Sequence, residues 1–245
     1  MKHNNTTTGI SLSILVVVLA GALAALAGAT PQGPDITYIG NSSADNSVPA
    51  NRSDAGAAIH TITMNLDQQD ANWKGYIGNI TGTLTLDDAN DDTIYNWAFA
   101  SMTGEIFITR SSSTTFSGMK CANGTTIGTE QTSMGFSSTD IDNINNTFDQ
   151  AQHASFLVGT TNITQSSCQA LYTYVDDASQ GAGTSNDFTS VLLQDDASNL
   201  IYTTIIADDS DGYQSNDNSF DFQTIVAQNK STTTPTQYFF WVELG

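Results

Sequence analysis

Residues 76–100 read YIGNITGTLTLDDANDDTIYNWAFA, and this stretch decides the fold class. From Tyr76 to Leu86 the side chains alternate with a period of two, which is typical of a half-buried β-strand. The polar run at 87–92 has the composition of a turn. Residues 93–100 then repeat the strand pattern, so the stretch predicts a β-hairpin.

Strand-like runs continue on both sides of this hairpin, separated by Gly, Asn or Asp. Upstream, residues 60–66 alternate in the same way, and GEIFITR follows at 104–110. Further runs lie at 154–159, 170–175, 188–194, 200–207, 220–227 and 237–244. Short strands at this regular spacing predict an all-β fold, an antiparallel β-sandwich or jelly-roll-like domain.

One short helix is expected within this domain, at 139–153 (TDIDNINNTFDQAQH). Asp140 is a candidate for its N-cap, because a side-chain carboxylate can accept a hydrogen bond from the first helical amides. Ile141, Ile144 and Phe148 recur at helical spacing and would share one face.

The first 29 residues have the order of a secretory signal peptide. A short, weakly basic start precedes an uncharged run at 10–26, and Ala27-Gly28-Ala29 supplies the small residues of a cleavage site. A retained membrane anchor is the first alternative, since the apolar run is close to the shortest that spans a bilayer. A leader cut near Gly9 is the second. The prediction is a signal peptide at 1–29 and a secreted or cell-surface protein.

The remaining chain divides into an arm and a domain. Residues 30–56 are rich in Pro, Gly, Ser and Asn and predict a polar, flexible arm, with some strand character at 36–39 (ITYI). Such a strand on an arm could complete the sheet edge of a neighbouring molecule. Residues 57–245 are expected to form a single β-sandwich-like domain.

The charge balance restricts the partners. The formal net charge is −19, from 25 acidic and 6 basic residues. Nucleic acid is excluded as a partner, because phosphate binding needs clustered Lys and Arg, and anionic lipid is disfavoured for the same reason. The excess of acid is compatible with a high-salt or Ca²⁺-rich setting, or simply with an acidic secreted surface.

Two covalent features are expected of an exported chain. Cys121 and Cys168 are the only cysteines, and the oxidising compartment predicts a disulfide between them. The mature chain also contains N-x-S/T sequons, which are candidate glycosylation sites. These sequons lie at Asn41, Asn51, Asn79, Asn123, Asn145, Asn162 and Asn229.

Acidic clusters raise the question of calcium. Asp208, Asp209, Asp211 and Asp217 surround Gly212, as in part of a calcium loop, although the EF-hand pattern fails at both ends. A second cluster lies at 87–92. Converging carboxylates favour a hard cation, so Ca²⁺ is a candidate ligand at 208–217. The alternative is a solvated turn in which Asp supports the backbone.

No established catalytic motif is present, so a non-enzymatic protein is predicted. H-E-x-x-H, G-x-S-x-G, the P-loop and the dinucleotide-binding glycine pattern are all missing. The alternative is a glycan-acting hydrolase that uses Glu105 and Glu243, because both lie in apolar strands where burial raises a carboxyl pKa.

Several motifs together resemble a group of uncharacterised archaeal exported proteins. They are W-x-G-Y-x-G-N-I-T-G (73–82), Y-N-W (95–97), G-E-I-F-x-T-R (104–110), D-F-Q (221–223) and Y-F-F-W-V-E-L (238–244). The resemblance covers most of the chain after residue 72, includes both cysteines and implies an extracellular protein of archaeal type. The group has no assigned activity, so it implies no catalytic residues.

These observations predict a structural protein of the cell surface, such as an envelope, filament or matrix component. Its partners would be copies of itself or other surface proteins. The first alternative is a carbohydrate- or surface-binding adhesin with exposed aromatic side chains, and Trp73, Trp97 and Trp241 are candidates for stacking on sugars. The second alternative is the hydrolase.

Overall fold

A computed structural model describes residues 30–44, 53, 56–57, 59, 62–64, 68–99, 101–216, 218–231 and 234–245. The predicted signal peptide, Asn51 and Asp217 lie outside these residues, as does most of the strand predicted at 60–66. Its described part, 62–64, has no regular structure. Among the described helices, none has the length and apolar character needed to cross a membrane.

The described elements are short strands and two short helices. In chain order they are β1 (Trp73–Gly78), β2 (Thr83–Asp87), β3 (Thr93–Ala98), β4 (Gly104–Thr109), β5 (Lys120–Cys121), α2 (Gly124–Ser133), α3 (Ile144–Thr147), β6 (Phe156–Val158), β7 (Thr161–Ile163), β8 (Ala170–Tyr172), β9 (Thr189–Gln194), β10 (Leu200–Ile205), β11 (Ser210–Asp211), β12 (Ser219–Phe220), β13 (Phe222–Ala227) and β14 (Phe239–Leu244).

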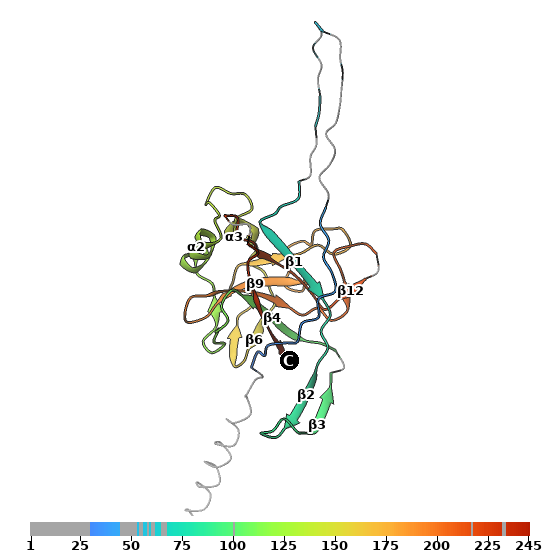
Figure 1. Ribbon diagram of the computed structural model, residues 1–245, viewed down its shortest axis with the longest axis vertical. Coiled ribbons are helices and arrows are strands. Elements are labelled where there is room, and N and C mark those ends of the chain that lie inside the picture. The colour runs from blue at the N-terminus through green and yellow to red at the C-terminus, as the bar shows by residue number, and fades with distance from the viewer. Residues whose placement is uncertain are drawn as a thin grey trace, which may run out of the picture.

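A six-stranded sheet forms the centre of the molecule (Figure 1). Its strand order is β14-β4-β10-β9-β5, and β8 pairs with β9 beside β5. The pairs β1–β13, β2–β3, β6–β7 and β11–β12 form separate two-stranded sheets. All these pairings are antiparallel. The predicted all-β, antiparallel sandwich class is therefore confirmed.

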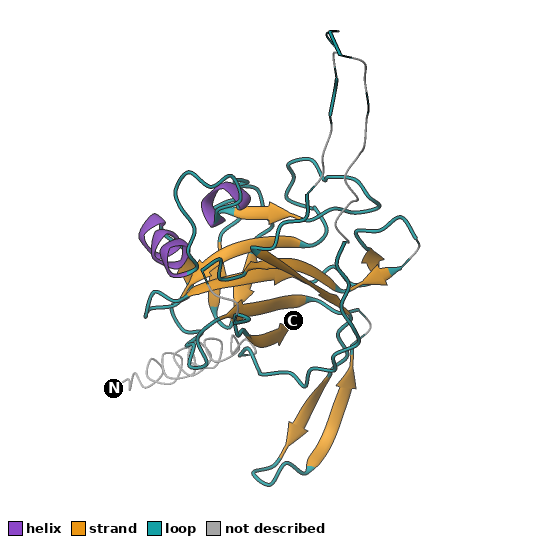
Figure 2. Cartoon of the chain, turned by 45° about the horizontal axis from the view of Figure 1, so that its top comes forward, coloured by secondary structure: helices purple, strands orange, loops and turns teal. Residues whose placement is uncertain are grey.

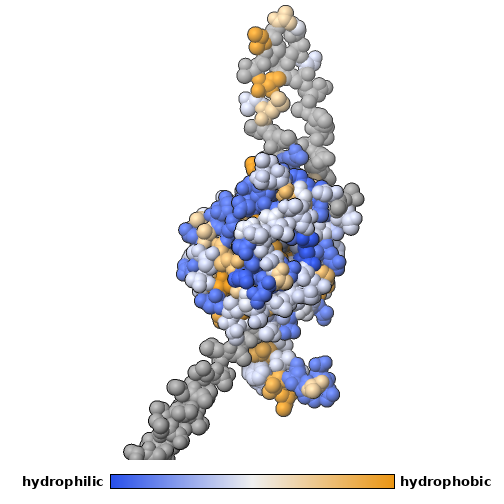
Figure 3. Space-filling view, turned by 90° about the vertical axis from the view of Figure 1, so that its left-hand side faces the viewer, coloured by the Kyte–Doolittle hydropathy of each residue, from blue (hydrophilic) through white to orange (hydrophobic). Residues whose placement is uncertain are grey.

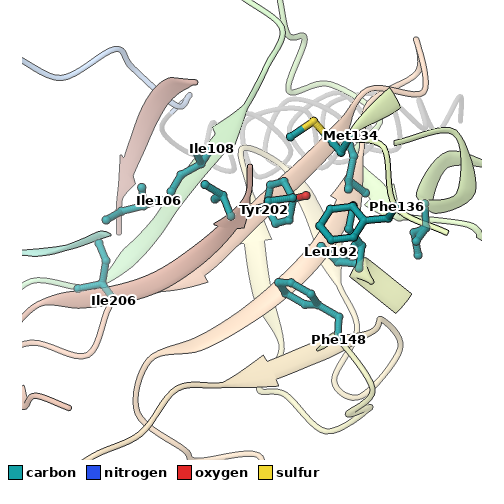
Figure 4. Packing of buried hydrophobic residues seen from close by; sticks show 13 residues of the cluster. Ile106, Ile108, Met134, Phe136, Phe148, Leu192, Tyr202 and Ile206 are labelled. Atoms are coloured by element: carbon teal, nitrogen blue, oxygen red, sulfur yellow. The ribbon is translucent and has the colours of Figure 1, made fainter. Parts of the chain in front are cut away.

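Both faces of the central sheet are buried, because successive side chains of a strand point to opposite faces. In β4, Ile106 and Ile108 belong to one core and Phe107 belongs to the other. The first core lies between the sheet, α2, α3 and the pair β1–β13, and Figure 4 shows Tyr202 of β10 near its centre. The second core includes Val191, Ile201 and residues of β6 and β7.

Two of the three tryptophans pack in these cores. The Trp73 ring lies 6.1 Å from the Phe136 ring, between centroids, and Trp241 lies 5.8 Å from Phe116. Both tryptophans are half-buried. They are therefore structural, and Trp97 alone remains exposed for an interaction.

The helix predicted at 139–153 is wrong over most of its length. Only α3 is helical there, and its N-cap is Asn143, whose side chain accepts a hydrogen bond from the Asn146 amide. Asp140 instead accepts from the Ser137 amide and binds Lys230, and Ile141 is 91% exposed. Asn and Asp favour turns that compete with helix.

The longer helix, α2, lies in a segment for which no helix was predicted, GTTIGTEQTS. Its Thr and Gly residues have low helix propensity, and only Thr126 and Ile127 of this helix are buried. Its start is fixed by Asn123, whose side chain accepts a hydrogen bond from the Thr126 amide. The helix is thus stabilised by its cap and by packing on the sheet.

The arm does not form the strand predicted at 36–39. Residues 33–44 have no regular structure and are exposed. The arm contacts the central sheet at Gln32, which exchanges two backbone hydrogen bonds with Val242 on the outer edge of β14. Pro31 and Pro34 flank this bridge, and proline cannot donate to a strand ladder.

The predicted disulfide is confirmed. Cys121 and Cys168 are bonded, with their Cα atoms 5.0 Å apart. The bond joins β5 to the segment before β8, and both of these strands pair with β9. It therefore links the two strands that share one edge of β9. In the chain-entropy model a disulfide that closes a loop of this length stabilises the folded state by about 4 kcal/mol.

Candidate interaction site

Hairpin β2–β3 projects away from the body of the molecule (Figures 1 and 2). Every residue of both strands is exposed. In its register Leu84 is opposite Trp97, and Leu86 is opposite Tyr95. Since residues opposite each other point to the same face, these four side chains form one surface, here called the apolar face.

The apolar face is accessible to a partner. Its four side chains are between 48% and 59% exposed, and Figure 3 shows apolar atoms on the projection below the body. Tyr95 and Trp97 contact each other edge to face, with ring centroids 4.8 Å apart. An isolated two-stranded hairpin is marginally stable in water, so a partner that covers this face would stabilise the hairpin.

The tip of the hairpin is an acidic turn held by its own side chains. Asp88 accepts hydrogen bonds from the Asn90 and Asp92 amides at 2.8 and 3.0 Å. Asp87 accepts from the hydroxyls of Thr85 and Thr93. These bonds lower the pKa of both carboxyls, so the tip stays negatively charged. Asp88 thus supports the backbone of the turn, and Asp87 binds two threonine side chains beside it.

The base of the hairpin is bound to the body by Asp221. This buried carboxylate accepts hydrogen bonds from the Ile80 amide at 2.5 Å and from the Asp209 amide at 3.1 Å. The Asp221 amide donates to the carbonyl of Gly78, the last residue of β1. The predicted continuous strand at 76–86 is therefore interrupted, because the Ile80 amide turns to Asp221 and leaves the ladder.

The predicted calcium loop lies at this base. Asp208 accepts a hydrogen bond at 2.8 Å from the amide of Met102, which lies between β3 and β4. Asp209 accepts from the Ser219 hydroxyl, and Asp211 is exposed in β11. Within the described ranges no three Asp, Glu, His or Cys side chains converge as metal ligands. Asp217 lies outside these ranges, so calcium stays a prediction.

Glu105 and Glu243 lie opposite each other in β4 and β14. Each is only 6% exposed. Burial raises the pKa of Glu105 to about 8, and the nearby charge of Glu243 contributes. Burial also raises the pKa of Glu243, whose carboxylate accepts a hydrogen bond from the Gly159 amide. A sugar ring could not reach a pair that is covered in this way.

A polar pocket of about 380 Å³ lies between α2, the end of β4 and the β9–β10 turn. Arg110 and Glu130 form a two-bond ion pair in its wall, with distances of 2.7 and 2.6 Å. Threonine and serine hydroxyls make up much of the remaining lining, which contains no aromatic side chain for stacking on a sugar. The pocket therefore offers mainly polar contacts, with Leu200 as its apolar lining residue.

The described basic side chains are all engaged within the chain. Lys120 pairs with Asp196, and Lys230 pairs with Asp140. Lys74 donates to the Thr236 carbonyl, and Arg110 binds Glu130. The described surface therefore offers little positive charge to bind the acidic tip of another molecule.

Six of the predicted glycosylation sites are described. Asn41, Asn79, Asn123, Asn145 and Asn162 are exposed. Asn229 is half-buried, and its side-chain amide donates to the Ser133 carbonyl. The first five are thus sterically open to modification, and the use of all the sites stays a prediction.

Comparison with protein-family models, curated proteins and solved structures finds no significant match. The resemblance to archaeal exported proteins stays a prediction. Sequence reasoning located the hairpin but not its exposure. Large apolar residues alternate in both strands of the hairpin, and such a pattern usually predicts a face that packs on the core. Nothing in this pattern indicates that the apolar face is exposed.

Proposed function

We propose that the protein is a non-enzymatic structural component of a cell surface that assembles with copies of itself through hairpin β2–β3. The observation that carries this proposal is the exposed apolar face on a projecting element. Contiguous apolar surface of this kind typically marks an interaction site. The exposed arm and the predicted signal peptide support an extracellular setting, as does the disulfide.

A second copy is the occupant that the hairpin favours. A two-fold symmetric contact joins the same surface of two molecules, and an uncharged apolar face can pack against its own copy. The acidic tips repel each other, and the described basic side chains are already paired. The two hairpins would therefore pack with their tips at opposite ends, which separates the acidic clusters.

Replacement of Trp97 by Thr tests this assignment. Thr keeps a high β-propensity but removes most of the apolar area. We expect Trp97→Thr to weaken self-association, measured by light scattering after size exclusion, by at least tenfold in Kd. Ile94→Thr is the matched control. The register shifts between the pairs Leu86–Tyr95 and Asp87–Thr93, so Ile94 is the extra residue of a β-bulge. It is 77% exposed and is not part of the apolar face.

Equal association of Trp97→Thr and the unmodified protein would contradict the assignment. Equal loss in Trp97→Thr and Ile94→Thr would indicate that the hairpin as a whole had been perturbed. Circular dichroism of both variants would separate that outcome from a specific contact.

Carbohydrate binding is the second candidate, supported by the exposed Tyr95–Trp97 pair. The two ring planes meet at 65°, however, so they do not form one flat platform for sugar rings. A glycan-array signal that Trp97→Thr abolishes, in a protein that stays monomeric, would favour this adhesin role over assembly.

A further inference from the structure

A pair of buried carboxyl groups lies at the C-terminal end of β14, separate from the apolar face. Glu243 of β14 and Glu105 of β4 are directly opposite in the register. By strand alternation both point to the face that carries Phe107 and Trp241. Opposite residues in an antiparallel pair have Cβ atoms about 4.5–5.5 Å apart, so these two buried carboxyls are close neighbours.

The tip of hairpin β6–β7 binds one member of this pair. The Gly159 amide donates to both carboxylate oxygens of Glu243, at 2.9 and 3.0 Å. Gly159 has a φ of +57° at the first position of a two-residue turn, where glycine is favoured. This turn aims the amide at Glu243 and so joins β6–β7 to the edge strand.

The backbones of β4 and β14 approach closely at the same place. Gly104 has a φ of +124°, and a Cβ at this position would lie 2.0 Å from the Glu243 carbonyl oxygen. The close approach holds the β14 backbone at Glu243 against β4. Two charges held in this way repel each other strongly in a buried site.

We propose that Glu105, Glu243 and the Gly159 amide form a latch that is closed when Glu105 is protonated and opens when Glu105 ionises. In the closed state the pair carries one negative charge, on Glu243, which the Gly159 amide stabilises. Ionisation of Glu105 places a second carboxylate opposite the first. Glu243 then moves away from Gly159, which releases the β6–β7 tip from β14.

Glu243 is the only ionisable side chain found to face Glu105 among the described residues. The β10 residue opposite Glu105 is Ile205, and Thr203 is its nearest neighbour on the same face. The strands β6 and β7 contain no ionisable side chain, and the preceding segment contributes Met102 and Thr103. The pKa of Glu105, about 8, places the opening at mildly alkaline pH.

The direction of the pH effect follows from the raised pKa. An unfolded glutamate ionises near its ordinary pKa of 4.5, whereas folded Glu105 keeps its proton up to about pH 8. The stabilisation is complete below pH 4.5 and is lost as the pH rises to 8. Over this window the folding equilibrium constant falls by up to about tenfold per pH unit.

Hydrogen exchange of the β6–β7 segment between pH 6 and pH 9.5 tests the latch, after correction for the intrinsic pH dependence of amide exchange. We expect protection of the Gly159 amide to fall about tenfold or more across pH 8. Glu105→Gln, a neutral variant of the same shape, should keep the amide protected throughout. Glu243→Gln removes the opposing charge, so ionisation of Glu105 should no longer open the latch and the alkaline transition should disappear.

Two results would overturn the latch. One is constant protection of the Gly159 amide in the unmodified protein from pH 6 to pH 9.5. The other is an unchanged alkaline transition in Glu105→Gln. Thermal unfolding of the same proteins shows whether each variant is folded, so a misfolded variant cannot be mistaken for an open latch.

Discussion

The carboxylate of Asp221 determines where the hairpin leaves the body. The carboxylate accepts hydrogen bonds from the Ile80 and Asp209 amides. The backbone of Asp221 forms further hydrogen bonds with Gly78 and Ala207. The two amides stabilise the buried Asp221 carboxylate. If the carboxylate is removed, both amides are left without a hydrogen-bond partner. The hydrogen bonds of Asp221 thus end β1 and fix the start of the segment that leads to the hairpin.

Asp221→Ala should therefore destabilise the protein by about 3–6 kcal/mol, since each of the two hydrogen bonds to this charged group contributes about 1.5–3 kcal/mol. Urea denaturation measures the free energy of unfolding. Asp221→Asn keeps one carbonyl acceptor and should lose less. An Asp221→Ala protein as stable as the unmodified one would show that water replaces the carboxylate at the hairpin base.

Hairpin β2–β3 and helix α2 depend on different sources of stability. The strands of the hairpin pair through a ladder with one β-bulge, but no other described element covers them. Helix α2 has low intrinsic helix propensity, but it is capped and packs on the central sheet. The hairpin is therefore suited to bind a partner, and α2 is suited to cover the central sheet.

Asn123→Ala should weaken α2 and lower the free energy of unfolding by about 0.5–2 kcal/mol, the usual cost of losing an N-cap. Asn123→Asp is the control, because it keeps the oxygen that accepts from Thr126. Both variants also remove the sequon, so a difference between them in urea denaturation reports the cap alone. Equal stabilities would contradict the capping role.

Much of the fold is predictable from alternation, and the exceptions have physical causes. The strands near 104–110, 188–194 and 237–244 were predicted because their apolar patterns are strong. The strand at 76–86 was predicted too long because Asp221 draws the Ile80 amide from 141 residues away. Local sequence carries no information about such a partner.

The candidate site was predictable only in part. Sequence patterns predicted the pairing of β2 with β3, and Glu105 and Glu243 drew attention as acids in apolar strands. That these acids face each other depends on the register of β14 with β4. That the hairpin is uncovered depends on where every other element packs, which alternation cannot reveal.

At the scale of the whole molecule, charge and apolar surface oppose each other. A net charge of −19 keeps copies apart at low salt, while the apolar face favours contact. Salt reduces the repulsion, because the Debye length falls to about 3 Å at 1 M. Self-association should therefore strengthen with salt, whereas binding to a basic partner would weaken.

Sedimentation velocity of the purified protein, at fixed concentration from 0.05 to about 2 M NaCl, tests self-assembly most directly. The monomer should give way to dimers as salt screens the acidic surface. A monomer at every salt concentration, or association that weakens as salt rises, would contradict assembly through the apolar face.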